Sequence, residues 1–80
     1  ELAKLNNMDA EIVEFNVSQN SKVLNKKIVE LNFPREAIIG GVIRNNQGII
    51  ALGEFKIMLN DRVLVCSTHE GLKKVESLFL

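Results

Sequence analysis

The stretch from Ala37 to Leu52 constrains the fold more than any other part of this sequence. Two apolar runs, AIIGGVIR and IIAL, flank the turn-rich segment NNQG, and this pattern predicts a β-hairpin. No side chain between Ala37 and Ile43 is polar, so both faces of the first strand are apolar. Protein must cover both faces of such a strand. In a chain of 80 residues, the domain's own core can cover one face, and we expect a second layer or a partner subunit to cover the other.

The remaining segments predict a small α+β domain of order β-α-β-β-(β)-β-α, with a mixed or antiparallel sheet and two helices. Strands are indicated by alternating or continuous apolar residues, and helices by apolar residues at helical spacing. The strands are expected at 9–17, 37–44, 48–52, 55–59 and 62–67, and the helices at 24–31 and 69–80. Pro34 ends the first helix because the residue before a proline avoids helical geometry. A Ser67-x-x-Glu70 capping box starts the second helix.

Apolar positions that share a face within each element define the expected core. These positions are Val13, Phe15, Val17, Ile28, Leu31, Ile39, Ile43, Val63, Val65, Leu72, Val75 and Phe79. Strict alternation along the central strand then turns Ile38 and Val42 away from this core. We therefore predict that Ile38 and Val42 lie at the interface of a homodimer.

Composition favours assembly over broad electrostatic binding. The sequence is 46% hydrophobic, but a chain of this size buries only ~60–65% of its unfolded surface and is marginally stable alone. Ten basic and ten acidic residues cancel, which argues against nucleic acid or an anionic membrane as a partner. A single cysteine allows neither an intramolecular disulfide nor a cysteine-based zinc site, and no metal site is expected.

The N-terminal segment ELAKLNN is polar and charged, unlike a signal peptide. We expect residues 1–9 to be a linker or the tail of a preceding domain, and residues 10–80 to form the domain itself. Apolar runs are too short for a membrane helix, so no direct membrane insertion is expected. The polar opening segment and the short apolar runs together predict a fragment of a longer cytoplasmic protein.

The sequence shows no catalytic constellation, and the expected function is binding or assembly. Arg44, Asn45 and Asn46 form the most notable polar cluster, at the end of the apolar strand. A guanidinium can hold phosphate bidentately, and asparagine can bond a purine edge or a ribose hydroxyl, so this cluster is the candidate ligand site. Asp61 is expected to close a turn by accepting backbone N–H bonds. A small enzyme that uses Cys66 and His69 is the alternative from another functional class.

The ordered series of these segments resembles the TrkA C-terminal domain, also called the RCK C-terminal domain. The resemblance covers residues 10–79. It rests on the strand EIVEFNV, the Lys-rich segment NKKIVEL with Phe33-Pro34 after it, the strand AIIGGVIR, and the final segment NDRVLVCSTHEGLKKVESL. No single motif is specific, but their order is.

The resemblance implies a non-catalytic, dimeric, ligand-sensing domain of a Trk-type potassium uptake system. It implies a cytoplasmic protein, peripheral to the inner face of the membrane, whose partner is a membrane potassium transporter subunit. Cyclic di-AMP is the ligand that it suggests for a two-fold groove at Arg44, Asn45 and Asn46. NAD or ATP would bind only a separate Rossmann-like domain, so no cofactor is expected here. The same module within an anion or amino-acid exchanger, or as the effector domain of a transcription regulator, remains an alternative.

Overall fold

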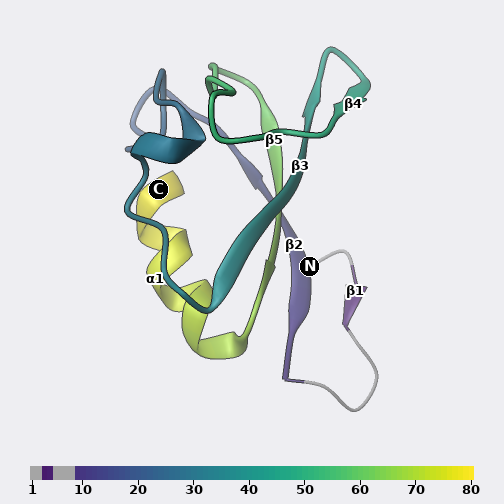
Figure 1. Ribbon diagram of the computed structural model, residues 1–80, viewed down its shortest axis with the longest axis vertical. Helices are drawn as coiled ribbons and strands as arrows, with labels where there is room; N and C mark the ends of the chain where they lie inside the picture. Colours follow the sequence, from purple (N-terminus) through teal and green to yellow (C-terminus); the bar gives the residue numbers. More distant parts are fainter. Residues whose placement is uncertain (1–2, 5–8) are drawn as a thin grey trace.

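The structure is a computed structural model that describes residues 3–4 and 9–80. It confirms the α+β class, with an antiparallel sheet in the order β1-β2-β5-β3-β4 and one α-helix (Figure 1). The elements are β1 (Ala3–Lys4), β2 (Glu11–Asn16), the 3-10 helix η1 (Ile28–Glu30), β3 (Ala37–Arg44), β4 (Gln47–Ile49), β5 (Arg62–Ser67) and α1 (His69–Phe79). β1 extends the sheet edge within the segment expected as a linker or tail, and the rest of residues 1–8 lies outside the described residues.

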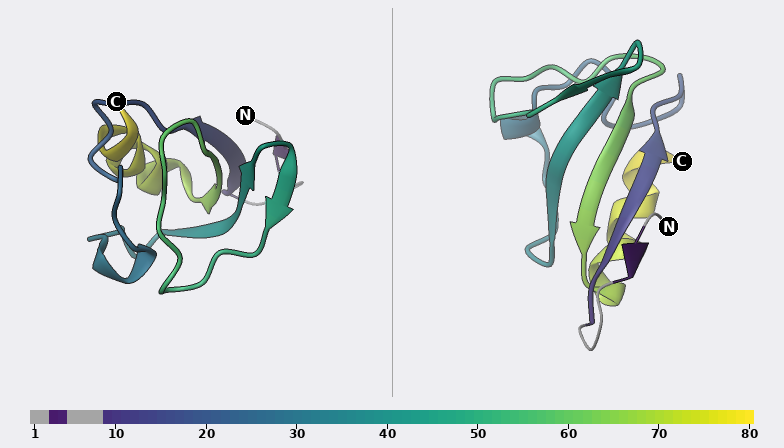
Figure 2. Two further views of the ribbon diagram at one scale, coloured as in Figure 1. Left: turned by 90° about the horizontal axis from the view of Figure 1, so that it is seen from above. Right: turned by 90° about the vertical axis from the view of Figure 1, so that its right-hand side faces the viewer.

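The sheet has one covered face and one open face. α1 and η1 both lie on the same side of the strands (Figures 1 and 2). In the right-hand view of Figure 2 the strands lie side by side in front of α1, with the open face toward the viewer. No helix among residues 3–4 and 9–80 covers that open face.

The core lies between β5, the adjoining strands and α1. Its buried apolar residues are Val17, Val23, Val42, Ile57, Val63, Val65, Val75 and Phe79. The rings of Phe15 and Phe79 stack with centroids 4.8 Å apart, joining β2 to the end of α1. Val63 and Val65 are 0% exposed, as the alternation of β5 predicts. Val13 and Leu72, also expected in the core, are only half-buried.

A β-bulge in β3 reverses part of the predicted pattern. Between Ile39 and Gly41 the register against β5 shifts by one residue. Val42 then pairs with Val63 and is 1% exposed, whereas Ile43 pairs with Arg62 on the open face. The predictions that Val42 faces a partner and that Ile43 lies in the core are therefore wrong, because one extra residue inverts the alternation.

The predicted first helix is also wrong, because this segment bonds across to another one. The peptide groups of residues 25–29 bond to residues 53–57, through Asn25 N–Ile57 O (2.8 Å), Ile57 N–Lys26 O (2.9 Å), Ile28 N–Phe55 O (3.0 Å) and Val29 N–Gly53 O (2.8 Å). We call residues 25–29 and 53–57 the ribbon. Within it only η1 is helical, and the strand expected at 55–59 is reduced to one isolated bridge between Lys27 and Lys56.

α1 begins at His69, as predicted, but its N-cap lies one residue after the predicted Ser67. Thr68 is the N-cap, and its Oγ1 accepts a hydrogen bond from the Gly71 amide at 3.1 Å. Gly71 is required by close packing, because a Cβ there would lie 2.9 Å from the Cβ of Glu36. The Thr68 amide also donates to the Glu36 carbonyl at 3.1 Å. These contacts fix the start of the helix against the start of β3.

Candidate functional site

The tip of the β3–β4 hairpin is a two-residue turn formed by Asn45 and Asn46. Their φ angles are 52° and 65°, in the left-handed region that asparagine tolerates. Arg44 and Gln47 pair directly before and after the turn. Both asparagine side chains are exposed, so their amides are accessible at the end of the sheet.

Arg44 points back into the protein instead of outward from the tip. Its Nε and Nη2 each donate to a different carboxylate oxygen of Asp61, both at 2.8 Å. Nη2 also donates to the Lys56 carbonyl at 2.9 Å, and the guanidinium lies 4.7 Å from the ring centroid of Phe55. Asp61 is 1% exposed and also accepts the Met58 amide at 2.8 Å. The guanidinium of Arg44, which was expected to hold a phosphate, is therefore already bound to Asp61.

The electrostatics of this pair favour both charged forms. Burial raises the pKa of Asp61, but hydrogen bonds from Arg44 and the Met58 amide, with the Arg44 charge, outweigh it and leave the pKa lowered. The hydrogen bond to Asp61 raises the pKa of Arg44 despite partial burial. Sequence reasoning predicted the backbone bond of Asp61 but missed Arg44, because no local pattern links positions 17 residues apart.

Ile38 lies on the open face of the sheet, as predicted. Ile38 pairs with Cys66 of β5, and Cys66 pairs with Ile12 of β2 on its other side. Ile38 is 65% exposed, and the other two side chains are half-buried. Cys66 thus belongs to an apolar cross-strand row, which does not provide the base that a nucleophilic thiol needs.

A second group of exposed apolar side chains lies on and beside the ribbon. Val29, Ile50 and Leu52 are 65%, 79% and 72% exposed. The carbonyl of Gly53, which follows Leu52, accepts the Val29 amide, and a Cβ at Gly53 would lie 3.5 Å from the Cβ of Val29. We call Val29, Ile50 and Leu52 the apolar strip. Sequence analysis placed Ile50 and Leu52 in a strand and did not identify them as a surface.

His69 lies between two carboxylates at the start of α1. Its Nδ1 contacts Asp9, and its Nε2 lies 2.9 Å from Oε2 of Glu11. The carboxylates approach opposite ring nitrogens, so they do not converge on one point. Among residues 3–4 and 9–80, no group of three or more histidine, cysteine or acidic side chains is arranged to hold a metal ion. His69 thus joins the start of β2 to α1.

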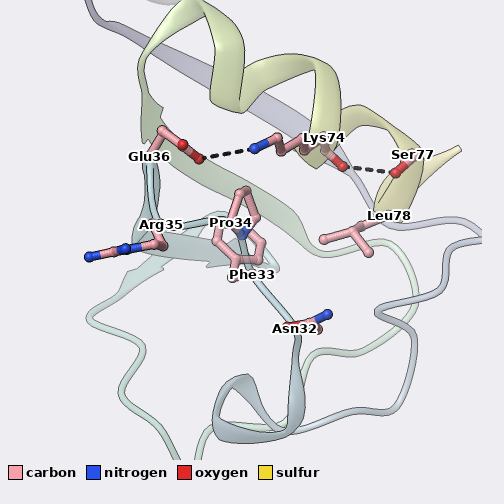
Figure 3. A pocket seen from close by; sticks show the side chains of 8 residues that line it. All are labelled: Asn32, Phe33, Pro34, Arg35, Glu36, Lys74, Ser77 and Leu78. Atoms are coloured by element: carbon pink, nitrogen blue, oxygen red, sulfur yellow. Dashed lines mark hydrogen bonds and ion pairs between the residues drawn. The ribbon is translucent and has the colours of Figure 1, made fainter.

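A groove of about 420 Å³ separates the segment before β3 from the outer side of α1 (Figure 3). Phe33, Pro34 and Leu78 line its apolar part. Glu36 and Lys74 form an ion pair across its upper edge, with Oε1 and Nζ 3.5 Å apart, while Arg35 points away. Both charged groups at this edge are therefore already paired with each other.

The architecture is that of an RCK-type domain, as a solved structure shows. A chain described as "Structure of RCK domain with cda" superposes with a TM-score of 0.73 and is 25% identical. The match covers 84% of this chain and 96% of that chain. The shared fold therefore extends over most of both molecules.

Sequence comparison identifies the family. The model of the TrkA-C domain matches residues 12–80, and the chain belongs to this family. Trk system potassium uptake protein TrkA homolog 2 of Methanosarcina mazei is 36% identical over 78 residues, which is 98% of this chain. A TrkA homolog of Archaeoglobus fulgidus is 33% identical over 63 residues, 79% of this chain. The chain spans 17% and 14% of the length of these two relatives.

Proposed function

We propose that this chain is the regulatory, dimerising and ligand-sensing domain of a Trk-type potassium uptake system. Family membership and the TrkA homologs named above support the link to potassium uptake. In this proposal the domain binds and assembles and does not catalyse. It acts in the cytoplasm, at the inner face of the membrane, on a transporter subunit. No helix within residues 3–4 and 9–80 is long and apolar enough to cross a membrane.

The observation that carries the dimerisation proposal is the apolar surface left open by the fold. The apolar strip and Ile38 expose large apolar side chains on a domain of only 80 residues. Several large apolar side chains left exposed on a domain this small favour a surface that a partner covers. A second copy related by a two-fold axis would cover the same surface on both subunits.

A functional exchange tests the link to potassium uptake. In the Methanosarcina mazei TrkA homolog, the matching segment is replaced by this chain, and potassium uptake is measured in cells that lack their own uptake systems. The proposal predicts uptake well above that of a homolog with the segment deleted. Uptake equal to the deletion, with the exchanged protein present at normal levels, would contradict it.

Cyclic di-AMP is the ligand that we propose. The solved structure that this chain matches is described as an RCK domain "with cda". Cyclic di-AMP is itself two-fold symmetric, so it suits a symmetric dimer. Since the Arg44 fork is occupied by Asp61, direct ligand contact falls to the exposed amides of Asn45 and Asn46. Two copies of the hairpin tip would supply these amides in pairs.

Calorimetric titration with cyclic di-AMP, ATP and NAD tests the ligand. Binding is expected for cyclic di-AMP alone, at one ligand per dimer. Asn46→Gly should weaken it, because glycine keeps the left-handed turn and removes only the amide. Asn20→Gly, at an exposed turn elsewhere, is the matched control. No heat with any of the three compounds, in a sample shown to be dimeric, would contradict the proposed ligand binding. The proposal of dimerisation would then be tested separately.

A further inference from the structure

We infer that Arg44 is a positioning residue that fixes the ribbon, and with it Val29 and Leu52 of the apolar strip, against the end of the sheet. Arg44 is the last residue of β3. The two groups it touches besides Asp61, the Lys56 carbonyl and the Phe55 ring, both belong to the ribbon. One side chain therefore bridges two parts of the fold.

Asp61 sets the direction of this bridge. The carboxylate holds Nε and Nη2 at 2.8 Å, which fixes the plane of the guanidinium. The same carboxylate accepts a hydrogen bond from the amide of Met58, which is the residue directly after the ribbon. The backbone of Asp61 is itself held in place. Asn60 before it adopts a left-handed conformation with φ 71°, and the Asp61 carbonyl accepts the Val17 amide at 2.9 Å.

The ribbon transmits this position to the apolar strip. Gly53 accepts the Val29 amide at 2.8 Å, and the Leu52 carbonyl accepts the Phe55 amide at 2.9 Å. Ile57 is buried in the core, so one end of the ribbon is held by apolar packing. At the other end lie Val29 and, one residue before the ribbon, Leu52; both are largely exposed. Arg44 acts on the residues between these ends.

Hydrogen exchange on the dilute, monomeric chain tests the positioning role without reference to dimerisation. Arg44→Lys keeps the charge but loses the two-pronged contact. We expect it to speed exchange at the amides of Ile28, Val29 and Ile57 about tenfold or more, since a lost charge-assisted hydrogen bond has at least this effect. Amides between β2 and β5 should change less. Arg62→Lys is the control, because the Arg62 guanidinium makes a longer ion pair, with Glu14 at 3.6 Å.

Two results would overturn the inference. Ribbon exchange in Arg44→Lys equal to that in Arg62→Lys would show that Arg44 does not hold the ribbon. Equal acceleration in the ribbon and between β2 and β5 would show a general loss of stability. Asp61→Asn removes the partner of the same bridge, and it should speed exchange in the ribbon more than exchange between β2 and β5.

The consequence for self-association rests on the proposed function. If the apolar strip is the dimer surface, Arg44→Lys should raise the dimer dissociation constant several-fold over Arg62→Lys. An unchanged constant alongside faster ribbon exchange would overturn the proposed coupling between bridge and interface. A wild-type chain that does not dimerise would contradict the proposed function, while the exchange experiment would still decide the positioning role.

Discussion

Removing the Asp61 carboxylate should be among the most damaging changes to this domain. Asp61→Ala deletes the acceptor of two hydrogen bonds from Arg44 and one from the Met58 amide. Breaking a buried ion pair costs about 3–5 kcal/mol. Since the Arg44 side chain is 32% exposed and can rehydrate, we expect the lower end, about 3 kcal/mol. A domain of this size has a total stability of only ~4–12 kcal/mol.

Urea unfolding at neutral pH, followed by circular dichroism, measures this loss as a lower midpoint with an unchanged slope. Glu14→Ala, which removes the longer ion pair to Arg62, is the matched control and should cost less than about 1 kcal/mol. A loss below about 1 kcal/mol in Asp61→Ala would refute the reasoning, because the bridge would then contribute no more than a surface pair.

The pH dependence gives an independent check with a definite sign. The pKa of Asp61 is lowered in the folded state, so its contribution is fully present above the pKa of the unfolded chain. It is lost as the pH falls through the folded-state value. The stability difference between wild type and Asp61→Asn should therefore be constant near neutral pH and shrink in acid. A difference that grows on acidification would contradict the assignment.

Five further substitutions separate core, packing and surface positions by the same unfolding assay. Val65→Ala should cost about 2–3 kcal/mol, because Val65 is 0% exposed, and more than Leu72→Ala at a half-buried position. Gly71→Ala should cost about 1–3 kcal/mol, since the new Cβ would lie 2.9 Å from that of Glu36, and a neutral result would argue against this close packing. Ile38→Lys should change the stability of the dilute, monomeric chain by less than about 0.5 kcal/mol, whereas Val42→Lys should prevent folding. Equal effects at these two positions would contradict the bulge.

The elements with a strong local signal could be predicted from the sequence. β5 matches its predicted bounds because the central residues of RVLVCS are apolar and include two β-branched valines. α1 follows from apolar residues at helical spacing, and the hairpin follows from its two flanking runs and the Asn45-Asn46 turn. In each case nearest neighbours in sequence decide the conformation.

The features that sequence reasoning missed depend on contacts between distant segments. The bulge brings Gly41 so close to β4 that a Cβ would lie 3.2 Å from the Ile49 carbonyl oxygen, and alternation alone cannot locate this extra residue. Residues 25–29 have helical spacing but bond instead to 53–57. The candidate site changed for the same reason: Arg44 was predicted at an exposed tip, and its partner Asp61 arrives from another loop.

Sedimentation equilibrium of the wild-type chain and of Leu52→Glu, over a micromolar concentration series, tests the central claim most directly. Leu52 is 72% exposed, so the substitution should leave the fold intact and place like charges across a symmetric interface. Leu80→Glu, at an 80% exposed position outside the apolar strip, is the matched control. We predict a dimer for wild type and Leu80→Glu and a monomer for Leu52→Glu. A wild-type chain that stays monomeric at high micromolar concentration would contradict the proposal that this domain dimerises.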